Sequence, residues 1–152
     1  MRCRILLVIT VLGLLICQTP AFSQKPDYSG TWKLNLQKSK LEADWTKGLT
    51  EGVFTITQNG DKFTLSRYFI INGKKQKLKI KMNADGKVRR KKILFKGRLE
   101  WMGNNLHAKI YRNGFSNVVD YKFGNNQNEF IADEVFIGRP QDYHNHWVFD
   151  RQ

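Results

Sequence analysis

The sequence lacks cysteine everywhere beyond residue 17. Both cysteines, Cys3 and Cys17, lie in an N-terminal apolar segment, so the rest of the chain carries no thiol. No disulfide and no thiolate metal site is therefore available to it. An exported domain without disulfides must be stabilised by burial alone, and residues 24–152 are numerous enough to build one ordinary core. We expect a single domain over this range.

The sequence also lacks an apolar run long enough to span a bilayer. Its longest run, Ile5–Cys17, covers about 13 residues, against roughly 20 for a transmembrane helix. Two arginines precede the run, and Pro20–Ser23 after it is typical of a cleavage region. We expect residues 1–23 to be a signal peptide, and the protein to be exported to the periplasm or beyond the cell. The residue before Cys17 is too large for lipoprotein processing, so we expect no lipid anchor.

Motifs that carry enzymatic chemistry are absent from the sequence. It contains no G-x-S-x-G elbow, Walker loop, G-x-G-x-x-G turn or H-E-x-x-H helix. Paired carboxylates can hydrolyse glycosides, but nothing in the sequence fixes their separation. The candidates for such a pair are Glu100, Glu129, Asp133 and Glu134. We expect a protein that is not an enzyme.

Two histidines have a spacing that suits a metal. His144 and His146 lie on the same face of a predicted strand, but that face is the outer one. A zinc or copper ion would need a third ligand, for which His107 and carboxylates are the available partners. We favour solvated histidines and expect no metal and no other cofactor.

Acidic residues are scarce in comparison with basic ones. The chain has 26 Lys and Arg against 13 Asp and Glu, a formal net charge of +13. Such a balance favours polyanionic neighbours, which for an exported protein are anionic envelope surfaces more often than nucleic acid. Basic charge also aids solubility without any partner. The sequence leaves both interpretations open.

Short β-rich runs separated by turn signals fill residues 28–152. Asn59-Gly60, Asn72-Gly73 and Asn113-Gly114 are pairs that tolerate positive φ and suit tight hairpins. The predicted strands are 28–36, 52–58, 62–71, 75–83, 88–96, 98–102, 105–112, 115–123, 128–137 and 144–150. Because curling removes exposed sheet edges, we predict an all-β fold: a single antiparallel up-and-down β-barrel of about 8–10 strands that closes on itself.

One segment after the first strand has a helix-like composition. Ser39 and Glu42 have the spacing of a capping box, which predicts a short helix or lid over 38–45. Trp45 in this segment either closes the barrel mouth or packs the segment down.

Strand parity separates inward from outward side chains. The inward set is mostly aromatic or branched, for example Trp32, Leu34 and Leu36 in the first strand. An apolar cavity with a few inward polar groups is the usual composition of a small-molecule site. The predicted ligand-binding residues are Arg67, Phe69, Trp101, Asn117, Tyr121 and Glu134. The alternative is a filled core, in which Arg67 and Glu134 form a buried salt bridge.

The two ends of the chain are expected to meet at one end of the barrel. In an up-and-down barrel the first and last strands are neighbours, which brings Trp32 near Arg151. A guanidinium stacked on an indole stabilises such an end by about 1 kcal/mol, and Gly30 suits a tight bend beside it. The alternative is that Trp32 is an ordinary core residue and Arg151 a frayed terminus.

A dense basic stretch lies in the middle of the chain. The outward residues of strand 75–83 are all lysines, and a basic run opens the next strand across the Asp85-Gly86 turn. The predicted anion-binding residues are Lys75, Lys77, Lys79, Lys81, Arg89, Arg90, Lys91 and Lys92. Two adjacent strands would form a cationic plate that docks phosphates. Equally, the lysines could keep a sheet edge from pairing with another chain.

Both ends of the domain resemble a known family. The pattern GTWKLN at Gly30–Asn35, KSKL at Lys38–Leu41 and VFDR at Val148–Arg151 resembles small exported bacterial proteins of the lipocalin-like, calycin type. The resemblance implies that Trp32 packs under the barrel with Arg151 across it. It also implies binding of a small apolar or amphipathic ligand by a monomer. The alternative function is a structural protein that binds polyanions or the envelope surface through its basic face.

Overall fold

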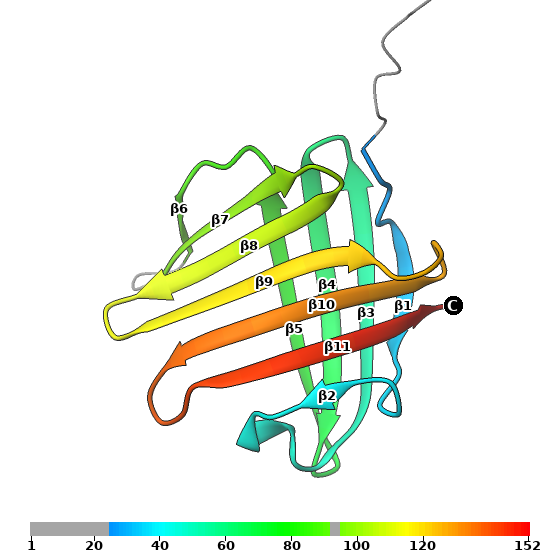
Figure 1. Cartoon of the computed structure of the whole chain (residues 1–152), viewed down its shortest axis with the longest axis vertical. Helices are drawn as coiled ribbons and strands as arrows, with labels where there is room; N and C mark the ends of the chain where they lie inside the picture. Colours follow the sequence, from blue (N-terminus) through cyan, green and yellow to red (C-terminus); the bar gives the residue numbers. More distant parts are fainter. Residues whose placement is uncertain (1–24, 92–94) are drawn as a thin grey trace, which may run out of the picture.

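The computed structural model describes residues 25–91 and 95–152, which form an almost purely β structure (Figure 1). A single 3-10 turn, η1, spans Asp44–Thr46. The strands are β1 (Gly30–Leu34), β2 (Lys40–Leu41), β3 (Leu49–Asn59), β4 (Lys62–Ile71), β5 (Lys74–Asn83), β6 (Arg89–Lys91), β7 (Phe95–Met102), β8 (Asn105–Arg112), β9 (Phe115–Phe123), β10 (Glu129–Gly138) and β11 (Tyr143–Arg151). The predicted all-β fold of about ten antiparallel strands is confirmed. Residues 1–24, which contain the predicted signal peptide, lie outside the described part.

The strands form one curled antiparallel sheet. Its hydrogen-bonded order is β5-β4-β3-β1-β11-β10-β9-β8-β7-β6, and β2 pairs separately with β11. β1 joins the two halves because it pairs with both β3 and β11. Figure 1 shows β7–β11 in front of β3–β5, with the interior between them.

The sheet does not close by hydrogen bonds, in contrast to the predicted closed tube. Within the described residues no ladder joins β5 to β6 or β7, and the two sides meet through one isolated bridge, Asp85 with Glu100. We call this break between β5 and the β6–β7 pair the seam. The Asp85-Gly86 turn predicted between these strands does not form a hairpin: residues 84–88 are irregular, and Asp85 bridges to Glu100 in β7.

The segment after β1 is not the predicted capped helix. Lys40 and Leu41 form β2 against β11, and η1 is one turn long. The Ser39 hydroxyl donates to the Asn35 carbonyl (2.7 Å) and accepts from the Val148 amide (3.0 Å), so it does not cap a helix. Because sheet pairing with β11 satisfies these groups, it replaces the helix that local composition favours.

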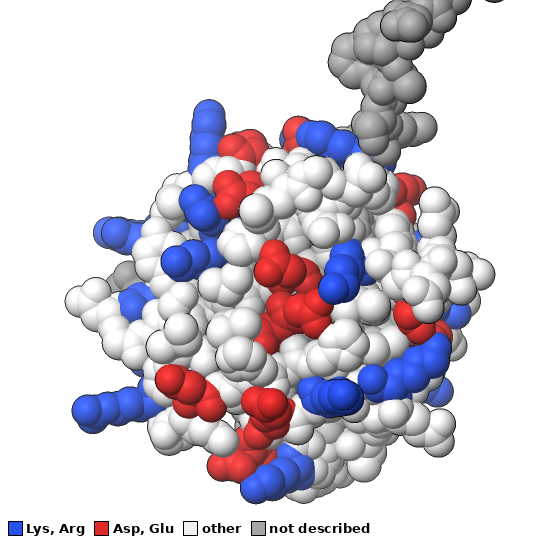
Figure 2. Space-filling model, in the orientation of Figure 1, with Lys and Arg blue, Asp and Glu red and all other residues white. Residues whose placement is uncertain are grey.

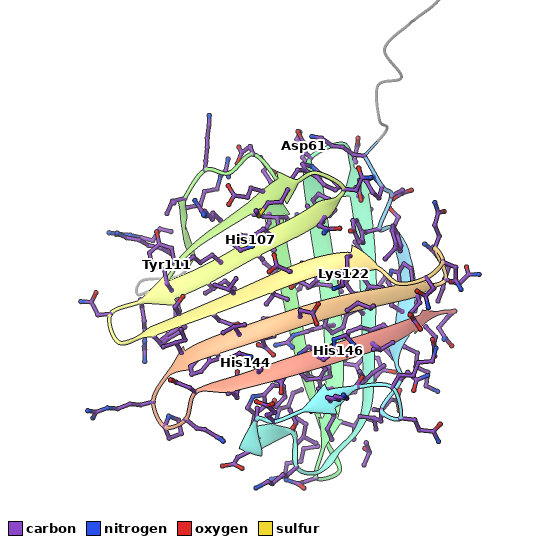
Figure 3. The ribbon with its side chains drawn as sticks, in the orientation of Figure 1. Asp61, His107, Tyr111, Lys122, His144 and His146 are labelled. Atoms are coloured by element: carbon purple, nitrogen blue, oxygen red, sulfur yellow. The ribbon has the colours of Figure 1, made fainter. Side chains whose placement is uncertain are left out.

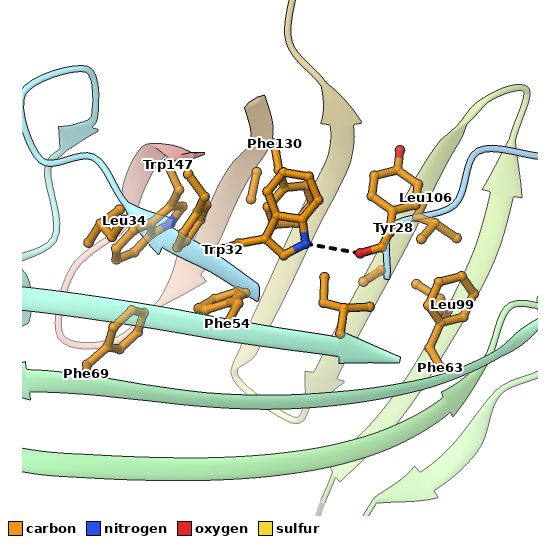
Figure 4. Close-up of a cluster of buried hydrophobic side chains, with 14 of the residues drawn as sticks. Tyr28, Trp32, Leu34, Phe54, Phe63, Phe69, Leu99, Leu106, Phe130 and Trp147 are labelled. Atoms are coloured by element: carbon orange, nitrogen blue, oxygen red, sulfur yellow. Dashed lines mark hydrogen bonds between the residues drawn. The ribbon is translucent and has the colours of Figure 1, made fainter. Parts of the chain in front are cut away.

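Aromatic residues dominate the core between the two halves of the sheet (Figure 4). Trp32, Phe130 and Phe149 are essentially inaccessible to solvent, and each buried ring of this kind contributes roughly 1.5–3 kcal/mol of burial energy. Leu36 departs from its predicted inward position: it follows the end of β1 and is 40% exposed. No helix in the described residues is long and apolar enough to cross a bilayer.

Candidate ligand-binding site

Tyr28 and Trp32 fill one end of the barrel. Trp32 donates from its indole Nε1 to the Tyr28 carbonyl (3.1 Å; Figure 4), and the Tyr28 ring stacks on Phe123 with centroids 4.6 Å apart. The cavity beside Tyr28 measures about 40 Å³ and has an almost wholly apolar lining. That is room for a few water molecules and far below the roughly 300 Å³ of a typical ligand pocket. This half of the barrel is therefore filled by side chains.

Arg151 covers Trp32 from outside. Its Cζ lies 4.1 Å from the indole centroid, and its guanidinium donates to the carbonyls of Ser29 (2.9 Å) and Gln127 (3.2 Å). Gly30 has φ +140°, and a Cβ there would lie 2.7 Å from Arg151 Nη1. The guanidinium therefore needs a glycine at this position. These contacts place Gly30, Trp32 and Arg151 together where the chain ends meet.

Arg67 lies on the inward face of β4, in the other half of the barrel. It pairs with Leu78 across the β4–β5 ladder, and its Cζ is 4.7 Å from the Phe69 ring centroid. Burial lowers the pKa of Arg67, although Tyr121, Glu134 and Tyr143 act in the opposite direction. Arg67 makes no hydrogen bond or ion pair with any described residue. The Arg67 side chain is partly buried, and its guanidinium donors are available to an acceptor that the described protein does not supply.

Glu134 does not form the predicted salt bridge with Arg67. Its carboxylate instead accepts three hydrogen bonds from neutral donors: Asn117 Nδ2 (2.8 Å), Asn145 Nδ2 (2.9 Å) and Trp147 Nε1 (2.9 Å). The sequence pattern did not single out Asn145, although it shares the strand parity of Trp147 and could have been found by it. Glu134 is thus held in place by β9 and β11 and is not the hydrogen-bonded counter-ion of Arg67.

Two further polar groups belong to this network. The Asn117 amide oxygen is buried without a hydrogen-bond partner, because its amide nitrogen is oriented toward Glu134. Burial raises the pKa of Tyr121 to about 12 and also raises that of Tyr143, with Glu134 contributing to both. Both phenols are therefore neutral donors near neutral pH. Together with Arg67 they supply donors, and Asn117 supplies an acceptor.

Solvent reaches several inward-facing side chains in this half. Leu78 faces the interior by its pairing with Arg67, yet it is 38% exposed, and its inward neighbour Ile80 is only partly buried. Val119 and Glu134 pair with each other on β9 and β10 and are partly buried as well. These inward side chains are therefore partly accessible from outside. β5 is an edge of the sheet, so its inward residues lie next to the seam.

Trp45 and Trp147 border this half at the β2 end. The Trp45 ring lies 6.0 Å from Phe69 and 5.7 Å from Trp147, while 40% of Trp45 stays exposed. Trp45 therefore both packs its segment down and contributes to the wall of the interior. Trp101, a predicted ligand-binding residue, lies elsewhere: at the filled end, it contacts Tyr28 and Phe63 and donates to Asp61 (2.8 Å). Figure 3 labels Asp61.

The predicted cationic plate is divided by the seam. Lys75, Lys77, Lys79 and Lys81 are exposed on the outer face of β5. β6, with Arg89–Lys91, pairs with β7 and not with β5, which differs from the predicted adjacency of the two strands. Arg89 is ion-paired with Asp85 (2.5 Å) and Arg90 is exposed, while Lys92 lies outside the described residues.

The histidines and the remaining carboxylates lie on the outer face. His146 pairs with Asp133 (2.5 Å) and His107 with Asp120 (2.7 Å), and Figure 3 shows these histidines on the face of β8–β11. Within residues 25–91 and 95–152, no three His, Cys, Asp or Glu side chains gather as a metal site would require. Of the four carboxylates considered for glycoside hydrolysis, only Glu134 faces inward.

Solved structures share this fold at low sequence identity. A secretory abundant heat soluble protein of Ramazzottius varieornatus aligns with a TM-score of 0.59 and 13% identity, covering 82% of this chain and 95% of its own. The zebrafish ileal bile acid-binding protein, complexed with cholic acid, aligns with a TM-score of 0.56 and 17% identity, covering 82% of this chain and 98% of its own. Fatty-acid-binding protein 1 of Echinococcus granulosus aligns with a TM-score of 0.57 and 10% identity, covering 82% of this chain and 96% of its own. No protein-family model and no curated protein matches the sequence.

These similarities define the class of fold. The chain has the fold of a lipocalin-like antiparallel β-barrel, which it shares with these solved structures. Identities of 10–17% establish the architecture and do not transfer a ligand.

Proposed function

We propose that this protein is an exported, non-enzymatic carrier that binds a small amphipathic anion inside its barrel. The observation that carries the proposal is Arg67: an inward guanidinium in a partly desolvated position without an ionic partner among the described residues. A partly desolvated charge without an ionic partner costs stability, and an anion that arrives with a ligand would supply that partner. The bile acid and fatty acids named for two structural neighbours are amphipathic anions, which supports this chemistry.

The surrounding residues suggest how such a ligand would lie. Its anionic group would accept from Arg67 and from the phenols of Tyr121 and Tyr143. Its apolar part would lie along the accessible inward face of β5, at Leu78 and Ile80. A hydroxyl or N–H on the ligand would satisfy the unpartnered amide oxygen of Asn117. The filled half around Tyr28 would not take part.

The test compares a charged probe with a neutral one of similar shape. We expect wild-type protein to bind oleate, and Arg67→Met to weaken oleate binding by about 10- to 100-fold, since a hydrogen bond to a charged group is worth roughly 1.5–3 kcal/mol. Binding of oleyl alcohol should be unchanged. Isothermal titration calorimetry measures both affinities, and Arg139→Met, at an exposed site, serves as the matched control.

A stability measurement separates loss of a ligand contact from loss of folding. Removing a buried unpaired charge should raise the urea midpoint of ligand-free Arg67→Met above that of wild type. Undiminished oleate binding by Arg67→Met, or no binding of oleate by wild type, would contradict the proposal. A lowered midpoint would show that Arg67 has a structural partner and would also count against it.

A further inference from the structure

The excess positive charge of residues 25–152 comes from the segment that flanks the seam. Residues 74–98 contain 12 Lys and Arg but a single acidic residue, Asp85. Residues 25–73 and 99–152 together contain 12 basic and 12 acidic residues, so the rest of the barrel is neutral overall. Figure 2 shows the β7–β11 face, where acidic and basic side chains are mixed. β5 lies behind this face (Figure 1).

Four lysines form one exposed row along β5. Lys75, Lys77, Lys79 and Lys81 alternate with inward residues, and all four are exposed. A surface hollow of about 340 Å³ lies beside them, lined by Lys77, Lys79 and the hydroxyl-bearing residues Thr55, Ser66 and Tyr68, among others. The ammonium groups of Lys77 and Lys79 and the hydroxyls of Thr55 and Ser66 suit a phosphate group, whereas the Tyr68 hydroxyl already donates to Glu51.

Aliphatic side chains accompany these charges. Val88 is 50% exposed between β5 and β6, and Leu78 is 38% exposed at the seam edge. Residues 74–91 contain no aromatic side chain. Single-stranded nucleic acid is bound by stacking of bases on aromatic rings, and Tyr68, the aromatic residue in the lining of the hollow, already has the Lys75 ammonium 3.6 Å from its ring centroid. Lysines beside exposed aliphatic groups match the interface of a bilayer that contains anionic lipids.

We propose that the seam side of the barrel docks on an anionic phospholipid bilayer. The β5 lysines contact the phosphate groups, while Val88 and Leu78 enter the interfacial region. Leu78 is also an inward residue paired with Arg67, so the docked seam gives an amphiphile a direct route from the bilayer to Arg67. That route rests on the carrier function proposed above, whereas docking itself does not.

The experiment measures binding to vesicles made of equal parts phosphatidylglycerol and phosphatidylcholine. Each lysine near an anionic surface is worth about a fivefold change in affinity, so changing Lys75, Lys77, Lys79 and Lys81 to Gln should weaken binding by roughly 600-fold. The control changes four exposed basic residues away from the seam, Lys33, Lys40, Lys47 and Arg139, to Gln. It removes the same charge and should weaken binding by less than about tenfold. All variants keep the same N-terminus, whose contribution cancels.

A matched pair of variants tests the aliphatic contact. Val88→Ser should weaken vesicle binding several-fold, whereas Ile137→Ser, at a side chain that is 58% exposed on the other side of the sheet, should not. Equal losses in the two four-fold variants would overturn the proposal, because they would indicate a general charge effect. So would wild-type binding to heparin or DNA without binding to the vesicles.

The docking proposal and the carrier proposal can be tested separately. Arg67→Met should keep vesicle binding while losing oleate binding, and the four-fold β5 variant should keep oleate affinity in solution while taking up oleate from vesicles more slowly. Loss of vesicle binding in Arg67→Met would overturn the docking proposal. Uptake from vesicles at the wild-type rate by the β5 variant would overturn the proposed route.

Discussion

At the scale of single residues, the interior combines groups that a core selected for stability alone would not contain. Arg67 makes no hydrogen bond to a described residue and the buried Asn117 Oδ1 lacks a donor, although Glu134 accepts three hydrogen bonds. A buried polar group without a partner costs about 1–3 kcal/mol, which an apolar residue of similar shape would recover. Arg67 is a hydrogen-bond donor and Asn117 Oδ1 is an acceptor, yet they do not hydrogen-bond to each other. A ligand with both an anionic group and a donor would satisfy both.

Tyr121 gives this interior a measurable pH dependence. Burial raises its pKa from 10.0 to about 12, so between these values the unfolded chain releases a proton that the folded chain keeps. The stabilisation is complete below pH 10 and is lost as the pH rises through 12. By linkage, the free energy of unfolding should fall by up to about 3 kcal/mol over this range on account of Tyr121 alone.

Urea denaturation of wild type and Tyr121→Phe at several pH values checks this expectation. The difference in unfolding free energy between the two proteins should move in favour of the variant above about pH 10, while lysine deprotonation affects both equally. Tyr28, whose pKa burial also raises to about 12, should give the same result in Tyr28→Phe. Parallel pH profiles for wild type and Tyr121→Phe would refute a buried phenol at this position.

At the scale of elements, one side chain ties the segment after β1 to the candidate site. Asn145 Oδ1 accepts from the backbone amides of Glu42 (2.8 Å) and Ala43 (3.2 Å), and its Nδ2 donates to Glu134. Asn145 is 2% exposed, so these groups have no access to water as a substitute. The segment that carries β2, η1 and Trp45 is therefore held by the same network that orients Glu134.

Replacing Asn145 should release this segment. Asn145→Ala leaves two amides and one carboxylate oxygen short of a partner, and we expect a loss of about 1–3 kcal/mol in unfolding free energy. Asn145→Asp should be worse, because it places a second carboxylate against Glu134. Trypsin should then cleave faster after Lys40 and Lys47 in both variants. Gln141→Ala, at an exposed position, is the control and should resist trypsin like wild type.

The regular strands were predictable, but the elements that depend on distant partners were not. Alternation and the Asn72-Gly73 turn, where both residues have positive φ, predicted β4 and β5 to within one residue. β2 was missed because its two residues owe their pairing to β11, a hundred residues away. Strand parity predicted which polar residues face inward. It did not predict the hydrogen-bond partners of Glu134, because hydrogen bonding between strands depends on rotamers and register. The seam was not predicted either, because the Asp85-Gly86 turn signal favours a hairpin between β5 and the next strand.

At the scale of the whole molecule, the excess positive charge lies beside the seam, where the sheet has an unpaired edge. β5 is an edge strand paired on one side only, and four lysines share its outer face at a spacing of about 7 Å. Like charges on one face of a strand repel each other by several tenths of a kcal/mol per neighbouring pair at low salt. Folding stability is thus reduced at the edge of the proposed docking surface.

Salt should reveal this repulsion. The Debye length falls from about 30 Å at 0.01 M to about 3 Å at 1 M salt, so sodium chloride should raise the free energy of unfolding in urea by about 1 kcal/mol. Changing Lys75 and Lys79 to Gln doubles the spacing of the remaining lysines and should stabilise the protein at low salt while flattening its salt dependence. The same change at Lys33 and Lys47, which belong to the neutral part of the barrel, should leave the salt dependence intact. If both double variants respond to salt alike, the charge of β5 carries no stability penalty. If only the β5 variant differs, the lysine row opposes folding, and an anionic bilayer that neutralises it would stabilise the docked barrel.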